Sequence, residues 1–253
     1  MDDIIQGDCL EVMKTLATES IDLTVTSPPY DNLRDYNGYT FDFEGIAKEL
    51  YRVTKQGGVV VWVVGDATIK GSETGTSFRQ ALFFKEIGFS METMIWEKTG
   101  SGCLGSNKFY GQNFEYNLLF VKGKPFHGSL IKDRENILKS GVANVNCSID
   151  KDGESKRRTI KLKPYGKRNN IWRIQPKQNS SHPAPFPLAL AQDHIISWSN
   201  EHDVVLDPMC GSGTTCKRAE KLNRRWIGIE ISEEYCEIAA KRIEQETKQR
   251  KMF

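Results

Sequence analysis

The sequence predicts an α/β fold with a mostly parallel sheet and helices on both of its faces. An apolar run at 203–206 leads into the glycine-containing turn Asp207–Thr215, and a helical segment follows. A second apolar strand, Trp226–Glu230, comes next and ends in an acid. The wholly apolar run Val59–Val64 is typical of a parallel strand that is buried on both faces. At 253 residues, the chain is long enough for one large domain or two small ones.

The strand, glycine turn and helix around 207–215 are typical of a small-molecule site. Glycines let the backbone approach a ligand closely, and the free N–H groups at the start of a helix point toward it. Glu230, at the end of the next strand, suits the two hydroxyls of a ribose. We therefore expect half of a Rossmann-like nucleoside-binding unit, although the spacing is G-x-G and not the full G-x-G-x-x-G of dinucleotide enzymes.

Prolines, glycines and apolar spacing divide the first half of the chain. The run Ile21–Thr26 cannot continue through Pro28 and Pro29, because proline lacks the N–H that a central strand needs. Gly57–Gly58 predicts a turn, and Ser77 is expected to cap the helix that follows it. The expected strands are 4–8, 21–26, 59–64, 91–98 and 116–122, and the expected helices are 9–16, 43–54 and 78–87.

The apolar pattern fades after Lys122. Residues 125–168 are polar and basic with only short apolar pieces, so regular structure is expected to resume near Ile171. The expected strands beyond that point are 171–174, 203–206 and 226–230, and the expected helices are 188–199, 216–222 and 233–248. The predicted organisation is one domain built from 1–122 and 171–253, with an insertion at 123–170.

The charge of the chain is unevenly distributed. The net charge is +2, but fifteen Lys or Arg residues oppose five Asp or Glu residues between 122 and 177, while the remainder carries a balance of −8. A polyanionic partner explains this asymmetry, and a solvated basic loop is the alternative. The six cysteines show no C-x-x-C pair and no metal-ligand spacing, so we expect reduced thiols in a cytosolic protein and no metal site. No apolar run approaches the roughly 18 residues of a membrane span, and the acidic start does not match a signal peptide.

The run Ser27-Pro28-Pro29-Tyr30 is the second pattern that indicates chemistry. Its prolines fix an extended backbone without N–H donors, so the Pro28 carbonyl can accept a hydrogen bond from a substrate amino group. The Ser27 hydroxyl adds a polar contact, and Tyr30 offers a flat face for stacking. This set suits an exocyclic amine on a planar base, and a plain turn at the end of a strand is the alternative interpretation.

Residues Thr26–Tyr30 resemble the catalytic motif of the DNA amino-methyltransferases, and Asp207–Thr215 resembles their S-adenosylmethionine motif. The turn His182-Pro183-x-x-Phe186-Pro187 and the strand at 227–230 also match. Because the catalytic motif comes first, the order is similar to that of the permuted β group of this family. The resemblance implies a Rossmann-like methyltransferase fold with a seven-stranded, circularly permuted sheet. It also implies that the basic insertion is a target-recognition region.

The resemblance assigns roles to individual residues. Ser27, Pro28, Pro29 and Tyr30 would form the catalytic turn. Glu230 would bind the ribose of the cofactor, and Asp8 would bind its adenine amino group. The full set of implied cofactor contacts is Asp8, Cys9, His182, Pro183, Phe186, Asp207, Pro208, Met209, Gly211, Ser212, Gly213, Thr214, Glu230 and Ile231. The expected DNA contacts are Arg34, Lys98, Arg157, Arg158, Lys161, Lys163, Lys167 and Arg168.

The implied reaction is direct methyl transfer from S-adenosylmethionine to an exocyclic amine of a base flipped out of duplex DNA. Serine at the first motif position is, by resemblance, more typical of cytosine N4 enzymes, so N4 is expected while adenine N6 stays open. Cytosine C5 methylation needs a cysteine nucleophile, and its usual Pro-Cys dipeptide is absent from the sequence. Three rival functions are methylation of RNA or protein amides, a non-catalytic DNA-binding module, and a nicotinamide-dependent oxidoreductase that would leave Ser27–Tyr30 unexplained.

Double-stranded DNA is the expected partner, and a companion restriction endonuclease is left open. The resemblance implies a bacterial, archaeal or phage-encoded enzyme that acts in the cytoplasm, as a monomer or a homodimer and without a membrane. The sequence does not specify the DNA target site, because the side chains that read the bases cannot be placed from it.

Overall fold

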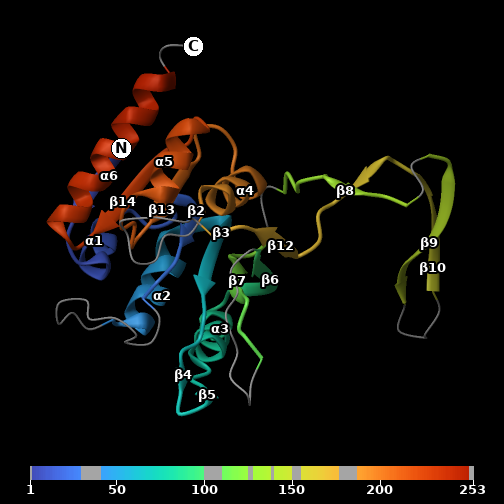
Figure 1. Cartoon of the computed structure of the whole chain (residues 1–253), viewed down its shortest axis with the longest axis horizontal. Helices are drawn as coiled ribbons and strands as arrows, with labels where there is room; N and C mark the ends of the chain where they lie inside the picture. The colour runs from blue at the N-terminus through green and yellow to red at the C-terminus, as the bar shows by residue number, and fades with distance from the viewer. Residues whose placement is uncertain are drawn as a thin grey trace. The chain divides into compact units, whose positions relative to one another are not determined.

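A single eight-stranded sheet forms the centre of the protein (Figure 1). The computed structural model describes residues 2–29, 41–99, 110–124, 128–137, 140–149, 155–176 and 187–250. The strands of this sheet are β1 (Asp2–Gln6), β2 (Ile21–Thr26), β3 (Thr54–Val64), β6 (Ser90–Lys98), β7 (Phe114–Val121), β12 (Ile171–Ile174), β13 (Val204–Asp207) and β14 (Arg225–Glu230). They lie in the order β1-β14-β13-β2-β3-β7-β6-β12. Only β7 runs antiparallel to its neighbours in this sheet, so the predicted mostly parallel sheet is confirmed.

The sheet has one strand more than the seven expected from the resemblance. The additional strand is β12, which pairs in parallel with β6 and places Trp172 opposite Trp96. The indole Nε1 of Trp96 donates to the carbonyl of Ile174 at 2.8 Å, which fixes β12 at the sheet edge. The run 171–174 is predicted as a strand, but its place in the sheet depends on this long-range contact.

The first strand of the chain lies beside the last one. β1 pairs in parallel with β14, with Gln6 opposite Glu230, and β14 pairs in parallel with β13, with Asp207 opposite Gly228. The chain therefore opens with the third strand of this half of the sheet and closes with the first two. This arrangement confirms the predicted circular permutation.

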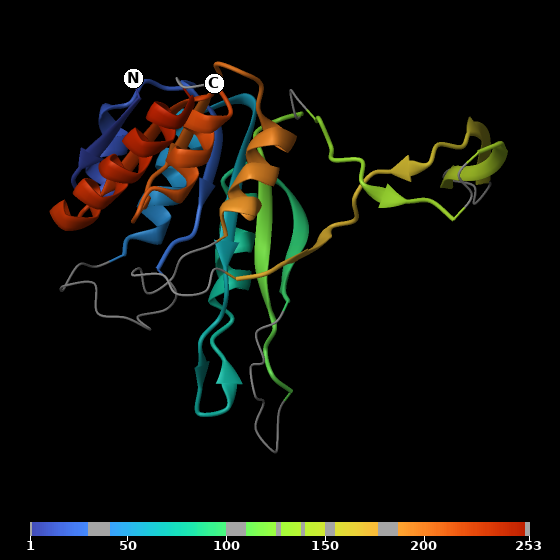
Figure 2. The same ribbon diagram turned by 45° about the horizontal axis from the view of Figure 1, so that its top comes forward.

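Helices cover both faces of the sheet (Figure 2). The helices α1 (Cys9–Thr15), α2 (Phe43–Val53) and α3 (Thr76–Glu86) pack on one face, and α4 (Leu188–Trp198), α5 (Thr214–Lys221) and α6 (Glu233–Arg250) pack on the other. Two apolar clusters, one under each group of helices, fill the layers between helices and sheet. Within the described ranges, no helix has the length and apolar character to cross a membrane.

The strand β3 is buried along its apolar half, as predicted, because each residue of Val59–Val64 is at most 1% exposed. The strand begins earlier than expected, at Thr54. Gly57 has a φ of 79°, and the register against β2 shifts near this point, so the glycine pair lies within an irregular part of the strand. A short hairpin, β4 (Thr68–Ile69) and β5 (Ser72–Glu73), follows β3.

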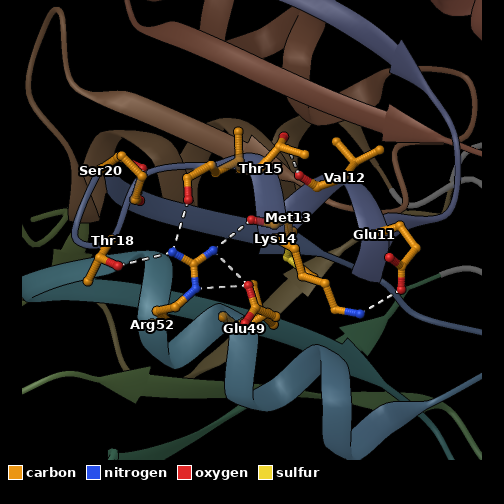
Figure 3. Close-up of polar contacts among 12 residues, drawn as sticks. Glu11, Val12, Met13, Lys14, Thr15, Thr18, Ser20, Glu49 and Arg52 are labelled. Carbon is orange, nitrogen blue, oxygen red and sulfur yellow. Dashed lines mark hydrogen bonds and ion pairs between the residues drawn. The ribbon is translucent and has the colours of Figure 1, made fainter.

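Arg52 of α2 holds the end of α1 (Figure 3). Its guanidinium donates to the carbonyls of Met13 at 2.8 Å and Leu16 at 2.9 Å, and Glu49 binds the same group at 2.7 Å. The last carbonyls of a helix have no further backbone N–H of the helix to accept from. The Met13 carbonyl also accepts from the Leu16 N–H at 3.0 Å, so Arg52 adds a second donor there and supplies a partner to the Leu16 carbonyl. The contact fixes α1, the helix that begins next to Asp8.

The start of α3 differs from the prediction. The helix begins at Thr76, its N-cap is Gly75 with a φ of 67°, and Ser77 lies inside the first turn. The carboxylate of Asp66 accepts hydrogen bonds from the Ser77 N–H at 2.9 Å and from the Ser77 hydroxyl at 2.5 Å. Capping by Ser77 is therefore wrong, because an acid eleven residues upstream satisfies this part of the helix start.

Residues Leu130–Asn169 form a second compact unit, while Met1–Ser129 and Asn170–Phe253 form the first. The second unit contains the antiparallel pair β8 (Arg134–Glu135) and β11 (Tyr165–Gly166), and the hairpin β9 (Val142–Ile149) and β10 (Ser155–Lys161). The sequence does not predict these strands. β8 and β11 have two residues each, and the residues of β9 and β10 whose burial the structure describes are exposed or half-buried, so no apolar face marks these strands in the sequence.

Substituting Gly228 on β14 should destabilise the fold. A Cβ at this position would lie 2.7 Å from Ile4 Cδ1, 2.8 Å from Cys216 Sγ and 3.0 Å from Cys210 Sγ. We expect Gly228→Ala to lower the free energy of unfolding by roughly 1–3 kcal/mol through overpacking, measured by urea denaturation. Gly128→Ala is the matched control, since a Cβ there meets nothing within 4 Å. Equal losses in the two variants would contradict the steric explanation.

Candidate functional site

Neighbouring parallel strands end at the same edge of the sheet and bring several predicted site residues there. Asp8 follows β1, Glu230 ends β14, Asp207 ends β13 and Ser27 follows β2. Adjacent strands are about 4.8 Å apart, so these positions form a row along the carboxyl edge. Ligands of open α/β sheets bind at this edge. The structure therefore places the start of the Ser-Pro-Pro turn next to the glycine turn.

A buried hydrogen bond joins these two turns. The Thr26 hydroxyl donates to Oδ1 of Asp207 at 2.8 Å, and both residues are at most 2% exposed. Burial raises the pKa of Asp207 from 3.8 to about 6, although hydrogen bonds from Thr26, Thr215 and the Met209 N–H act in the opposite direction. The sequence assigned no role to Thr26, because its partner lies 181 residues away along the chain.

The carboxylate of Glu230 binds the backbone of the protein itself. Oε2 accepts from the Gly211 N–H at 2.8 Å, and Oε1 accepts from the Ser232 N–H at 3.0 Å. Gly211 has a φ of 49°, a left-handed conformation that glycine adopts without steric cost. Glu230 therefore shapes the glycine turn, and its contact with a ribose stays a prediction.

Arg242 on α6 is a further residue at the glycine turn. Its Nη1 donates to both the carbonyl and the hydroxyl of Ser212. The next residue, Gly213, has a φ of 75°, and a Cβ there would lie 2.9 Å from the Cβ of Ala239 on the same helix. Sequence reasoning missed Arg242. The sequence signal that could have indicated this contact is the spacing of Ala239 and Arg242, which are three positions apart and therefore lie on one face of a helix.

Asp8 and Cys9 lie at the start of α1. Oδ1 of Asp8 accepts from the N–H groups of Leu10 at 2.9 Å and Glu11 at 3.1 Å, so this acid is the N-cap of the helix. Burial raises the pKa of the Cys9 thiol to about 12, which keeps it neutral. Met209 packs against the apolar cluster on the α1–α3 side of the sheet. An acid, a neutral thiol and a thioether thus border this edge.

The start of α5 offers backbone donors. Gly213 is its N-cap, and no side chain in the described part of the chain caps the helix. The first N–H groups of a helix lack partners within it and favour an anion. Together with Asp8 and Glu230 on the neighbouring strands, this end fits a nucleoside that carries a carboxylate, as S-adenosylmethionine does. Four of the residues predicted for this site and one predicted DNA contact lie outside the described residues: Tyr30, His182, Pro183, Phe186 and Arg34.

The predicted DNA contacts fall into two groups. Lys98 pairs with Glu115 at 2.5 Å, and Arg168 binds Asp133 through Nε at 3.0 Å, so these two cations are already paired. Arg157 lies in β10, but its side chain is outside the described structure. The exposed cations without an ion pair to a described residue are Arg158, Lys161, Lys163 and Lys167. In the described ranges, no group of three or more His, Cys, Asp or Glu side chains could hold a metal ion.

A permuted Rossmann-like sheet with a glycine turn beside a Ser-Pro-Pro turn defines an enzyme of the methyltransferase fold. The chain belongs to the DNA methylase family, whose sequence model matches residues 21–241. The protein is therefore a DNA methyltransferase, and its cofactor is S-adenosylmethionine.

Individual relatives agree with this assignment. The chain is 55% identical over 249 residues to the orphan methyltransferase M.BamHII of Bacillus amyloliquefaciens, covering 94% of this chain and 90% of that one. It is 29% identical to the DNA adenine methyltransferase YhdJ of Escherichia coli K12, covering 95% and 82% of the two chains. The crystal structure of TTHA0409 from Thermus thermophilus, complexed with S-adenosyl-L-methionine, matches with a TM-score of 0.66 at 25% identity, covering 97% and 94%.

Asp207→Asn should change how stability depends on pH. Well below pH 3.8 the Asp207 carboxyl is protonated in both folded and unfolded chains. As the pH rises to about 6, the unfolded chain ionises first, so the stability that the protonated, buried carboxyl contributes is lost. The amide oxygen of asparagine can still accept from Thr26. We expect the unfolding free energy of the variant, relative to wild type, to rise by about 2 kcal/mol between pH 4 and 6.5. Parallel stability curves in urea titrations would contradict the buried-carboxyl argument.

Proposed function

We propose that this DNA methyltransferase transfers the methyl group of S-adenosylmethionine to the exocyclic N4 of cytosine in duplex DNA. The observation that carries the proposal is the Thr26–Asp207 hydrogen bond, which holds Ser27 and Pro28 beside the glycine turn. A direct transfer requires the amine and the methyl group to lie in line at close range. Serine at the first position of the turn favours cytosine N4, by resemblance to the β group.

Ser27 and Pro28 carry out the positioning in this mechanism. S-adenosylmethionine supplies a methyl group that its sulfonium activates. Pro28 is buried and Ser27 is half-buried, so a base inside a duplex cannot reach them and must be extruded. The Ser27 hydroxyl and the Pro28 carbonyl accept the two amino hydrogens, and Tyr30 stacks on the ring. Ser27, Pro28 and Pro29 include no strong base, so the proton leaves to water after the transfer.

Adenine N6 methylation is the second candidate. It is favoured by the relative described as a DNA adenine methyltransferase, which is 29% identical over 262 residues. Cytosine and adenine both present an exocyclic amine, and the Ser27-Pro28 turn can hold either. Adenine is the larger base, so the two candidates differ in the room that the base needs beside Ser27 and Pro28.

The second unit, Leu130–Asn169, is proposed to recognise the DNA target. Its exposed lysines suit phosphate contacts, which position a protein on a duplex without reading its sequence. The reaction is proposed to take place in the cytoplasm, as for other enzymes that act on bacterial DNA. A companion restriction endonuclease and the choice between monomer and homodimer stay predictions.

The product of the reaction identifies the target base. Purified protein is incubated with plasmid DNA and S-adenosylmethionine that carries an isotopically labelled methyl group. Nuclease digestion and mass spectrometry should then detect labelled N4-methylcytosine. Labelled N6-methyladenine would overturn the N4 assignment, and unlabelled DNA would overturn both. Ser27→Ala should slow the transfer roughly tenfold while cofactor affinity, measured by calorimetry, is retained.

Lysines of the second unit should contribute to DNA binding. We expect Lys161→Gln with Lys163→Gln to weaken DNA binding and to flatten its dependence on salt, because each lost phosphate contact lowers the slope by about 0.9. Cofactor affinity should be retained. The matched control is Lys241→Gln with Lys248→Gln, which removes two exposed lysines of α6. If both pairs changed the salt slope equally in a fluorescence binding assay, specific contacts by the second unit would be excluded.

A further inference from the structure

The β4–β5 hairpin is short, held by hydrogen bonds at its base and exposed at its tip. Its strands pair Thr68 with Glu73 and Ile69 with Ser72. The two turn residues, Lys70 and Gly71, have φ values of 51° and 81°, which is the pattern of a type I′ turn. A residue other than glycine rarely has a positive φ, so the conformation of Lys70 is an uncommon one that the hairpin turn requires.

Hydrogen bonds anchor the base of this hairpin. Asp66, which is 7% exposed, accepts from the Ser77 N–H and hydroxyl and from the Thr74 hydroxyl at 3.3 Å. The Thr74 N–H donates to the Ala67 carbonyl at 2.9 Å. The amide of Gln112 also binds Glu73, at 3.1 Å. The hairpin is therefore fixed to the start of α3 and to the segment before β7.

The tip carries an apolar side chain that the fold does not use. Ile69 is 59% exposed, and the exposed ammonium-bearing Lys70 follows it. Both views show the hairpin projecting beyond the end of β3 toward which the strand arrow points (Figures 1 and 2). Removing an apolar residue from contact with water stabilises a protein, so this exposed isoleucine contributes little to folding.

The hairpin leaves the sheet next to the catalytic turn. β2 and β3 are adjacent and parallel, with Thr26 opposite Trp62. The residues after Val64 therefore leave the same edge, one strand away from Ser27-Pro28-Pro29. A duplex whose base enters the catalytic turn has to pass close to this edge.

We propose that Ile69 inserts into the base stack beside the target base and helps to extrude it, while Lys70 contacts a neighbouring phosphate. This inference rests on the proposed base-extrusion mechanism. Isoleucine is among the apolar side chains that proteins insert between base steps, and the adjacent cation suits the DNA backbone. A hairpin that hydrogen bonds hold at its base is suitable, because a wedge must resist displacement when the bases close.

The test compares Ile69→Ala with the control Leu82→Ala, which shortens an aliphatic side chain that is 66% exposed on α3. The methylated sequence is first mapped by sequencing plasmid DNA treated with the wild-type protein. Two duplexes are then used, one with the target base paired and one with it opposite an abasic site. Unpaired bases cost less to extrude.

Ile69→Ala should slow single-turnover methylation about tenfold on the paired duplex and less than twofold on the abasic duplex. Leu82→Ala should change neither rate, and cofactor affinity should be equal in all variants. Equal slowing on both duplexes, or none on the paired one, would overturn the wedge. Because the rates are read on whichever base the mapping identifies, a product of N6-methyladenine would overturn the N4 assignment without affecting this result. Lys70→Gln should weaken binding to both duplexes alike, and unchanged binding would remove the phosphate contact from the proposal.

Discussion

The hydrogen bond between Thr26 and Asp207 is the contact on which the site depends. It joins the ends of two neighbouring strands, one leading to Ser27 and the other to the glycine turn. A buried carboxylate is costly unless it is hydrogen-bonded, and Asp207 accepts from Thr26 and from the Met209 N–H. The raised pKa of Asp207 shows that desolvation outweighs these bonds. Any displacement of one turn therefore disturbs the other, and the distance between amine and methyl group depends on both.

The permutation leaves this contact intact. Thr26 and Asp207 come from opposite ends of the chain, yet β2 and β13 are adjacent in the sheet. The first strand of the chain, β1, lies at the outer edge of the parallel half of the sheet. The break in chain order that the permutation makes therefore does not separate β13 from β2. Methyl transfer needs the geometry of neighbouring strands and not their order along the sequence. This explains how one site can be built from a permuted chain.

Local patterns predicted what depends on neighbouring residues, and they failed where distant residues interact. The run Val59–Val64 and the glycine turn could be predicted because each follows from the chemistry of a few adjacent positions. The tie between Arg242 and Ser212, the capping of α3 by Asp66, and the pairing of Lys98 with Glu115 could not. Each contact joins residues that are far apart in the sequence, and only the folded sheet brings them together. The composition of the basic segment shows its positive charge, but it does not distinguish Arg168, which pairs with Asp133 in the same unit, from the exposed lysines.

The acids at the carboxyl edge bind the protein's own backbone. Asp8 caps α1, and Glu230 holds the Gly211 and Ser232 N–H groups, so both carboxylates are positioned by the fold. A ligand that uses them does not have to order them, which favours affinity. The same bonds reduce the number of backbone donors at the glycine turn, because the Gly211 N–H donates to Glu230 and is not free for the cofactor. A loss of cofactor affinity after removal of Glu230 would therefore combine a missing ligand contact with a changed turn. Replacing Arg242, which contacts Ser212 from α6, alters the turn and leaves the Glu230 carboxylate in place, so the two contributions can be separated.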